Sequence, residues 1–337
     1  MDGLPIEERS GLSYASKARA VGLDGIEQPS MHACGHDTHM TALVGTARQL
    51  IKRRERWRGT VVFIGQPGEE RSKGAKAMLD DVLYTRFPKP SVALAFHVNA
   101  GDEAGQVRVS QETAYSSSDN LDLKVRGVGT HGAFPQLGVD PVLIAAEIIV
   151  ALQTMVTRTI DPLEPALISV GAIHGGSKHN IIPEEVLLQL TVRAESPEVR
   201  QRLLDGIAQV ANGIATAHGV AANSLPVLTL QESTPVTAND PALAKRLTAA
   251  VAAQVGTERM STRKRTGMGA EDFAYLIVPQ LGVKGVYLSI GGTPKAELAA
   301  AAGHHSPLFK VSPEPVVTTA IEAMTSAALE LLDKPSR

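Results

Sequence analysis

Apolar and polar residues alternate most regularly in the middle of the chain. Every second position is apolar over 120–127, which is the period of a half-buried strand. The same alternation over 186–193 predicts a second strand, and apolar runs near 166–173 and at 225–230 predict two more. The segments between these strands have a different period.

Two of those segments carry apolar residues at helical spacing. Asp140 and Pro141 are a suitable N-cap and first residue for a helix over about 141–157. Ser196 begins a second helix, which ends near Gly219. The residues predicted to face the core are Val142, Ala145, Ile149, Leu152 and Val156 in the first helix, and Val199, Leu203, Ile207, Val210 and Ile214 in the second.

These elements follow the order strand, helix, strand, strand, helix, strand over 118–230, which is the ferredoxin-like arrangement. On both sides of it, strands and helices alternate as in an α/β sheet. The flanking helices are predicted at 39–54, 72–83, 241–255 and 315–332, and the flanking strands at 60–65, 91–97 and 285–290. Because neither flank alone makes a full sheet, we expect one α/β domain with a mixed sheet, residues 1–117 plus 231–337, interrupted by a second domain at 118–230.

Composition restricts the classes of partner. The 337 residues are 43% hydrophobic, enough for a core in each of two domains, and the net charge of −2 gives no basic excess for nucleic acid. The most apolar helical stretch, 142–152, is interrupted by Glu147 and is expected to be too short for a membrane span. The single cysteine, Cys34, fits a reducing compartment, so we expect a cytoplasmic protein.

Residue types that commonly bind metals are concentrated in four segments of the sequence, mostly next to predicted strand ends or helix starts. They are MHACGHDTH at 31–39, GQPGEE at 65–70, His97 at the end of an apolar strand, and HHSPLF at 304–309. In the first motif, Cys34 and His36 can reach one ion, and Asp37 can orient a histidine ring. Alone, an adjacent glutamate pair is more often a solvated surface pair, and a strand-terminal histidine is equally a ligand or a core residue.

Together the motifs supply a mixed set of sulfur, nitrogen and oxygen donors. The donors are Cys34, His36, Glu70, His97 and His305. This set suits Zn, Mn, Ni or Co rather than Ca or Mg. Five donors are too many for one tetrahedral ion, whereas two ions about 3.5–4 Å apart would use them all and hold a hydroxide between them.

The same motifs occur in this order in a known family. MHACGHD, the Q-P-x-E-E pair, His97, GGSKHNIIP at 175–183, GAEDF at 269–273 and HHSP resemble the metal-dependent amidohydrolase branch of the aminoacylase and carboxypeptidase family. That branch includes hippurate hydrolases, N-acyl-amino-acid amidohydrolases and auxin-conjugate hydrolases. The resemblance runs the whole length of the chain.

The resemblance implies a dinuclear centre for two divalent ions. Cys34 would be the thiolate shared by both ions, and His36, Glu70, His97 and His305 would complete the two coordination spheres. Glu69 would be the general base and acid, which activates the bridging water and returns the proton to the leaving amine.

The resemblance also implies roles for the inserted domain. His131 would stabilise the tetrahedral oxyanion in the active site of the partner subunit, which requires a homodimer formed through this domain. Asn180 and Arg193 would hold the free carboxylate of the substrate, although a turn asparagine and a solvated strand arginine are equally compatible with the sequence. Asp272 would support the site from outside the coordination sphere.

The implied activity is cleavage of the amide bond of a small N-acyl amino acid. One alternative is a dipeptidase or carboxypeptidase with the same site. Another is a catalytically silent metal- or ligand-binding homologue, because family members usually carry a longer N-terminal stretch that ends in the MDxLP found here at 1–5. A Cys34 nucleophile with His36 as its base is disfavoured, since residues two apart rarely place a base correctly.

Overall fold

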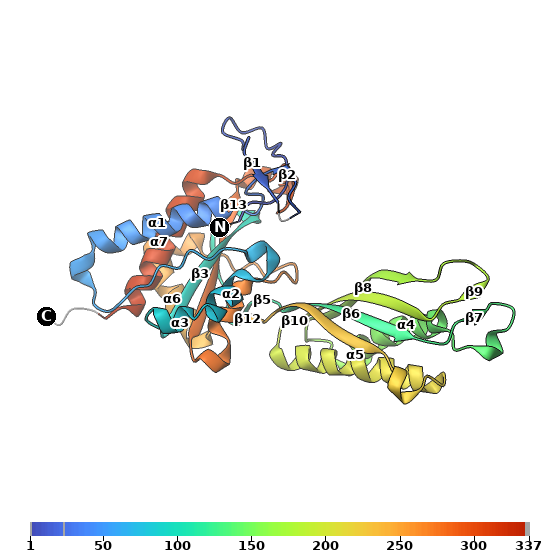
Figure 1. Ribbon diagram of the computed structural model, residues 1–337. Helices are drawn as coiled ribbons and strands as arrows, with labels where there is room; N and C mark the ends of the chain where they lie inside the picture. Colours follow the sequence, from blue (N-terminus) through green and yellow to red (C-terminus); the bar gives the residue numbers. More distant parts are fainter. Residues whose placement is uncertain (1, 23, 334–337) are drawn as a thin grey trace. The chain divides into compact units, whose positions relative to one another are not determined.

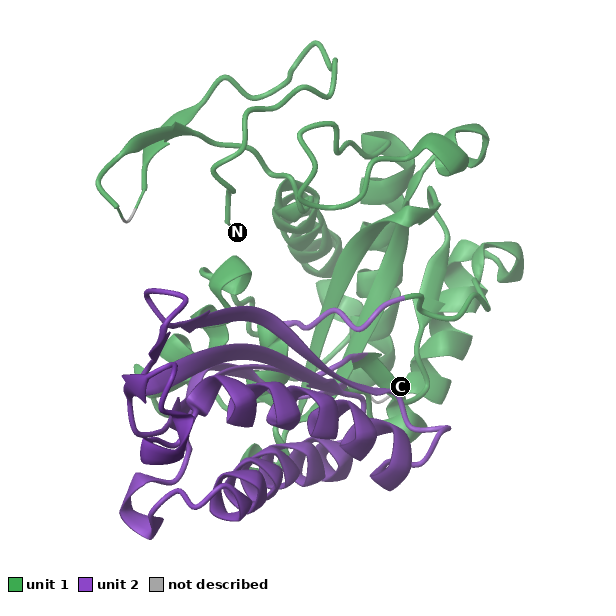
Figure 2. Cartoon of the chain, turned by 90° about the vertical axis from the view of Figure 1, so that its right-hand side faces the viewer, with its two compact units in different colours: residues 1–114, 238–266, 272–337 green, residues 115–237, 267–271 purple. Residues whose placement is uncertain are grey.

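The computed structural model describes residues 2–22 and 24–333. The chain divides into two compact units (Figure 2). Unit 1 comprises Met1–Ala114, Ala238–Thr266 and Asp272–Arg337, and unit 2 comprises Tyr115–Thr237 and Gly267–Glu271. The sequence-based boundaries at 117/118 and 230/231 differ from these by a few residues, and the short segment Gly267–Glu271 belongs to unit 2 rather than to the α/β domain.

Unit 2 has the ferredoxin-like topology that the sequence predicts. Its sheet has the order β11-β6-β10-β8, and every neighbouring pair is antiparallel. The strands are β6 (Ser118–Arg126), β8 (Ala166–Gly175), β10 (Glu185–Ala194) and β11 (Val227–Thr234), and the helices are α4 (Pro141–Thr159) and α5 (Pro197–Ala217). Both helices lie on the same face of this sheet (Figure 2). The inward residues of β10 are almost completely buried, as their alternation predicts.

The core-facing side of α4 agrees only in part with the predicted one. Ala145 and Leu152 are buried as predicted, but Val142 is 47% exposed, and the buried side also contains Ile144 and Ile148. The helix is apolar on nearly every side, so periodicity alone does not determine which stripe packs inward. The α5 stripe is closer to expectation, and Ala211 and Ala215 continue it in place of larger residues.

The length of α4 also differs from expectation. Among the described residues, α4 is the one helix that is long and apolar enough to cross a membrane when only length and composition are considered. The prediction that this stretch is too short for a span was therefore wrong. The core helices of globular proteins pass the same test, and one face of α4 belongs to the unit 2 core.

Unit 1 contains a mixed sheet, as predicted. Strand β13 (Lys284–Thr293) runs parallel to β3 (Val92–Glu103) and antiparallel to β4 (Val107–Val109). Helices α1 (His36–Lys52), α6 (Pro241–Val255) and α7 (Pro313–Leu331) pack together beside this sheet (Figure 1). Their apolar faces and β13 form a second hydrophobic core that is separate from the core of unit 2.

The remaining elements are short. The helices are α2 (Gly74–Asp80) and α3 (Leu83–Arg86), and the strands are β1 (Arg19–Val21), β2 (Glu27–Pro29), β5 (Thr113–Tyr115), β7 (Thr130–His131), β9 (Ile181–Ile182) and β12 (Thr237–Ala238). Single turns of 3₁₀ helix span Arg54–Arg56, Glu69–Arg71, Pro135–Leu137, Ala222–Ser224, Thr257–Arg259 and Pro279–Leu281, and longer ones span Asp272–Ile277 and Lys295–Ala300.

Two predicted elements of unit 1 need correction. Residues 60–65 form no strand, because they have no ladder partner in the described part of the chain and their apolar pattern by itself supplies no backbone pairing. The helix predicted over 72–83 is divided into α2 and α3, with Val82 in a left-handed conformation between them.

Candidate metal centre

The turn before α1 brings Cys34 and His36 together. The helix begins at His36, three residues earlier than predicted, and its N-cap is Gly35 at φ 80°. A Cβ at Gly35 would lie 2.4 Å from Cγ1 of Val98, so the position has room only for glycine. Cys34 and His36 are both buried, at 8% and 3% exposure.

His97 lies in β3 with its ring turned toward Cys34. Its Nε2 is 3.5 Å from Sγ of Cys34. Its Nδ1 lies 2.6 Å from the carbonyl oxygen of Val98, and because a carbonyl only accepts, Nδ1 carries the proton. The Nε2 lone pair therefore faces the sulfur, which is the orientation that a metal ligand needs.

The loop that carries the two glutamates is held by a carboxylate from the N-terminal stretch. Asp2 accepts hydrogen bonds from the backbone N–H groups of Gly68 (2.8 Å) and Glu70 (2.9 Å). Burial acts to raise the pKa of Asp2, but these backbone N–H groups and the positive charge of the chain N-terminus together lower it, and the net pKa is lowered. Sequence reasoning missed Asp2 because its backbone partners are 66 and 68 residues away along the chain.

A second carboxylate supports the same loop from the other side. Asp272 is fully buried and accepts hydrogen bonds from the Gln66 side chain and from the backbone N–H of Ala75 at 2.9 Å. The loop closes tightly, since a Cβ at Gly74 would lie 1.4 Å from the carbonyl oxygen of Pro67. Asp272, which was predicted to support the site, thus holds both ends of the segment 66–75, which we call the carboxylate loop because it contains Glu69 and Glu70.

His305 reaches the loop from late in the chain. Its backbone N–H donates to the carbonyl of Ala33 at 2.9 Å, which ties it to the turn before α1. Its Nε2 lies 3.1 Å from Oε2 of Glu70. Its φ of 66° is unusual for a residue with a Cβ, although histidine tolerates the left-handed region better than most.

These residues form three overlapping groups of donors. Within each group, one ligand atom per residue lies within 4.8 Å of the others. The groups are Cys34, His36 and His97; Cys34, Glu70 and His305; and His36, Glu69 and Glu70. The structure thus brings the five predicted donors together, with Cys34 common to the first two groups and Glu69 beside them.

Two further observations indicate that these donor residues are suited to bind divalent ions. Nδ1 of His36 and Oε1 of Glu70 are buried polar atoms without a hydrogen-bond partner. Burying such atoms unpaired costs about 1–3 kcal/mol each, which coordination would offset. The mixture of thiolate, imidazole and carboxylate is also the chemistry that Zn, Mn, Ni and Co accept.

Three imidazoles at the centre, those of His36, His97 and His304, are kept neutral. Burial lowers the pKa of His36 to about 4, with a further contribution from the nearby His97. Burial also lowers the pKa of His97, and it lowers that of His304 to about 3. A neutral ring offers a lone pair to an ion at physiological pH, whereas a protonated one does not.

Comparison with known proteins decides the family. The model described as Peptidase family M20/M25/M40 matches residues 1–330. The chain belongs to this family. Membership confirms the resemblance that the motifs indicated and the class of enzyme, a hydrolase of amide bonds.

Three curated relatives in the family carry deacetylase names. The chain is 35% identical over 223 residues to the N-acetyl-L-cysteine deacetylase of Bacillus subtilis (66% of this chain, 51% of the relative). It is 33% identical to the N-acetyldiaminopimelate deacetylase of Leuconostoc citreum (86% and 70%) and 31% identical to an N-acetylcysteine deacetylase of Bacillus subtilis (99% and 80%). The matched region thus spans about half of the first relative and more of the others.

A solved M20 structure has the same fold. The YXEP protein of Bacillus subtilis, described as a dinuclear metal binding peptidase from the M20 family, is 27% identical and superposes with a TM-score of 0.77. The match covers 99% of this chain and 80% of that one.

The predicted residues of unit 2 fall at two ends of its sheet. His131 in β7 pairs with Ile181 in β9, beside Asn180, whose Oδ1 is buried without a hydrogen-bond partner. Arg193 lies near the other end of β10, eight residues from Glu185, or roughly 26 Å at about 3.3 Å per residue. There its Nη1 donates to the carbonyl of Met268 at 3.1 Å, and burial lowers its pKa. Within unit 2, Asn180 thus precedes the start of β10 and Arg193 lies near its end, and their shared role in holding a substrate carboxylate stays a prediction.

Three residues of the first and last motifs behave differently from expectation. Asp37, predicted to orient a ring, is exposed in the first turn of α1 and hydrogen-bonds to no histidine ring in the described part of the chain. The carbonyl of Val98 orients His97 instead. His39 accepts from the backbone N–H of Val98 at 3.0 Å, and His304 lies 3.5 Å from the Cys34 sulfur. Sequence reasoning gave neither histidine a role.

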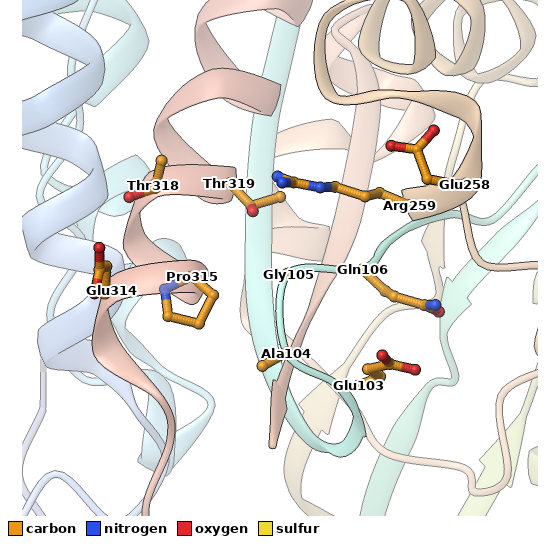
Figure 3. Close-up of a pocket in the computed structure, with 10 residues that line it drawn as sticks. All are labelled: Glu103, Ala104, Gly105, Gln106, Glu258, Arg259, Glu314, Pro315, Thr318 and Thr319. Carbon is orange, nitrogen blue, oxygen red and sulfur yellow. The ribbon is translucent and has the colours of Figure 1, made fainter. Parts of the chain in front are cut away.

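Unit 1 also has an open cavity of about 450 Å³ (Figure 3). Three glutamates line it together with Arg259 and the first turns of α7. None of the donor residues is part of its lining. The cavity is therefore distinct from the candidate metal centre.

Proposed function

We propose that the chain hydrolyses the amide bond of small N-acyl amino acids, with N-acetyl amino acids as the first substrates to test. The observation that most strongly supports this proposal is the cluster of metal-binding side chains, in which Cys34 is common to two donor groups and Glu69 lies beside them. Two relatives named for N-acetylcysteine and one named for N-acetyldiaminopimelate support an acetyl group on an amino acid. The reducing compartment that a single cysteine favours supports a cytoplasmic location.

Cys34, His36, Glu70, His97 and His305 would hold two divalent ions, for which the dinuclear M20 relative is the precedent. Zn, Mn, Co and Ni all suit these donors. Bound there, such ions polarise a carbonyl and lower the pKa of water. The buried unpartnered atoms of His36 and Glu70 support this assignment.

We infer different tasks for the two adjacent glutamates. Glu70 is fixed by Asp2 at its backbone and lies against His305, which suits a ligand. Glu69 has a side chain that is 17% exposed and lies 3.7 Å from Nε2 of His36. We assign to Glu69 the proton transfer from the attacking water to the leaving amine.

His131 is suited to stabilise the oxyanion. The backbone N–H of Ala133 donates to its Nδ1 at 3.0 Å, so a neutral ring carries its proton on the exposed Nε2. We propose that this N–H acts in the active site of a partner subunit in a homodimer. Exposed apolar residues on α4, including Leu143 and Val150, support a contact through unit 2.

The test is turnover by the metal-loaded chain on N-acetyl amino acids, hippurate and dipeptides. Glu69→Gln is expected to abolish turnover and to retain the wild-type metal content, while the exposed Glu164→Gln serves as a matched control with full activity. Faster turnover of dipeptides than of acyl amino acids would replace the proposal with the peptidase alternative. Absence of turnover in the metal-loaded wild type would overturn it.

A further inference from the structure

The Cys34 sulfur has a histidine ring on each of two sides. Nε2 of His97 and Nδ1 of His304 both lie 3.5 Å from it. Geometry alone makes the two rings look equivalent. The ring nitrogens that face away from the sulfur, Nδ1 of His97 and Nε2 of His304, show that the two rings differ.

His97 presents a lone pair to the sulfur. Its Nδ1 donates to the Val98 carbonyl, so Nε2 is unprotonated in the neutral ring. In the ion-loaded centre this nitrogen is available as a ligand.

His304 presents a proton to the sulfur. The backbone N–H of Ala100 points at its Nε2 at 3.3 Å, and because an amide N–H can only donate, Nε2 must accept. The proton of the neutral ring is then on Nδ1, and the contact with Cys34 is an N–H···S hydrogen bond. Neither nitrogen of His304 has a lone pair left for an ion.

We propose that His304 is a positioning residue, whose Nδ1–H donates to the Cys34 sulfur and sets the direction and charge of the thiolate in the metal centre. This inference rests on the proposed function, because it assumes that Cys34 is a ligand. Cys34 belongs to two of the donor groups, so one hydrogen bond to its sulfur would act on both proposed ions. An N–H donor withdraws charge from a thiolate and stabilises its lone pairs.

Two isosteric variants separate this role from a structural one. The amide nitrogen of asparagine lies near the position of histidine Nδ1, so His304→Asn keeps the donor to sulfur and loses the acceptor for Ala100. Glutamine reaches the position of Nε2, so His304→Gln keeps the acceptor and loses the donor. His304→Leu loses both.

The experiment is the near-ultraviolet thiolate-to-cobalt charge-transfer band of the Co²⁺-loaded full chain, with Co²⁺ affinity measured by chelator competition. We expect the band of His304→Gln and His304→Leu to move to longer wavelength and their affinity to fall by about 10–100-fold. His304→Asn is expected to resemble the wild type in both measurements.

The opposite ranking, with glutamine normal and asparagine impaired, would overturn the proposal in favour of a structural bond to Ala100. An unchanged band in all three variants would overturn it as well, while leaving the metal centre intact. A wild-type protein without any charge-transfer band would overturn both this inference and the assignment of Cys34 as a ligand.

Discussion

Left-handed backbone conformations occur at single residues that bring the donors together. Gly35 precedes His36 at φ 80°, Gly68 precedes Glu69 at φ 64°, and His305 itself has φ 66°. Such conformations cost free energy in residues with a Cβ, and they persist where the surrounding structure fixes them. Here each left-handed residue changes the direction of the backbone so that a side chain of the candidate metal centre lies close to the others.

Gly35→Ala tests this dependence. The left-handed conformation costs about 1–2 kcal/mol for alanine, and the clash with Val98 adds about 1–3 kcal/mol. We expect lower unfolding free energy in urea and loss of metal binding. Gly213→Ala, inside α5 with open space around it, is the control and should stabilise the fold by about 0.5–1 kcal/mol. Equal effects of the two substitutions would contradict this account.

The neutral state of His36 makes the stability of the metal-free protein depend on pH. Its pKa is lowered to about 4 from 6.5, so below pH 6.5 the unfolded chain binds more protons than the folded one. The stabilisation is fully present above pH 6.5 and is lost as the pH falls toward 4. The unfolding free energy measured in urea should decline through this window. His36 contributes up to about 1.4 kcal/mol per pH unit, and the lowered pKa values of His97 and His304 add to the decline.

His36→Gln should make that decline less steep. A decline of the same slope in His36→Gln would show that other groups cause it.

The five candidate donors could be singled out from the sequence because four of them stand in compact motifs and His97 interrupts an apolar strand. Asp2 and His304 could not be assigned roles, because their partners are remote: Asp2 binds the backbone of Gly68 and Glu70, and His304 binds Cys34 across 270 positions. The tautomers that distinguish His97 from His304 depend on backbone groups that no side-chain pattern reveals.

At the scale of elements, the predicted order of strands and helices in unit 2 was confirmed, and two of the failures elsewhere in the prediction have a common cause. The face of α4 and the state of residues 60–65 depend on what packs against them rather than on their own pattern. Where a helix is polar on one side, as in α5, the pattern specified the buried face. Strand pairing is a property of two segments, so an apolar run alone did not predict it.

The carboxylate loop is the element on which catalysis should depend most. Asp2→Ala removes the acceptor for two backbone N–H groups and leaves the positions of Glu69 and Glu70 less constrained. We expect a loss of about 10–100-fold in metal affinity or in kcat/KM, measured by dialysis and by initial rates. Asp205→Ala, on the surface of α5, is the control. Wild-type metal affinity and kcat/KM in Asp2→Ala would show that these two hydrogen bonds have no role in the metal centre.

At the scale of the whole molecule, the two units have separate hydrophobic cores and separate sets of predicted functional residues. The donors and Glu69 belong to unit 1, and His131 and Asn180 belong to unit 2. If His131 acts on a partner subunit, two inactive variants should complement each other.

Mixing His131→Ala with Glu69→Ala under conditions of subunit exchange tests this directly. One site of each mixed dimer then has an intact Glu69 and receives an intact His131. Random mixing is expected to restore about a quarter of wild-type activity. Without restoration in a mixture shown by native mass spectrometry to contain mixed dimers, His131 does not act across subunits.

The central claim is that Cys34 serves two ions at once. Equilibrium dialysis of Zn²⁺ against the wild type, Cys34→Ala, His97→Ala and Glu70→Ala measures this most directly. We predict two ions per wild-type chain, one tight site retained in each of the His97 and Glu70 variants, and weakened binding at both sites in Cys34→Ala. A Cys34→Ala protein that keeps one site at wild-type affinity would contradict the account.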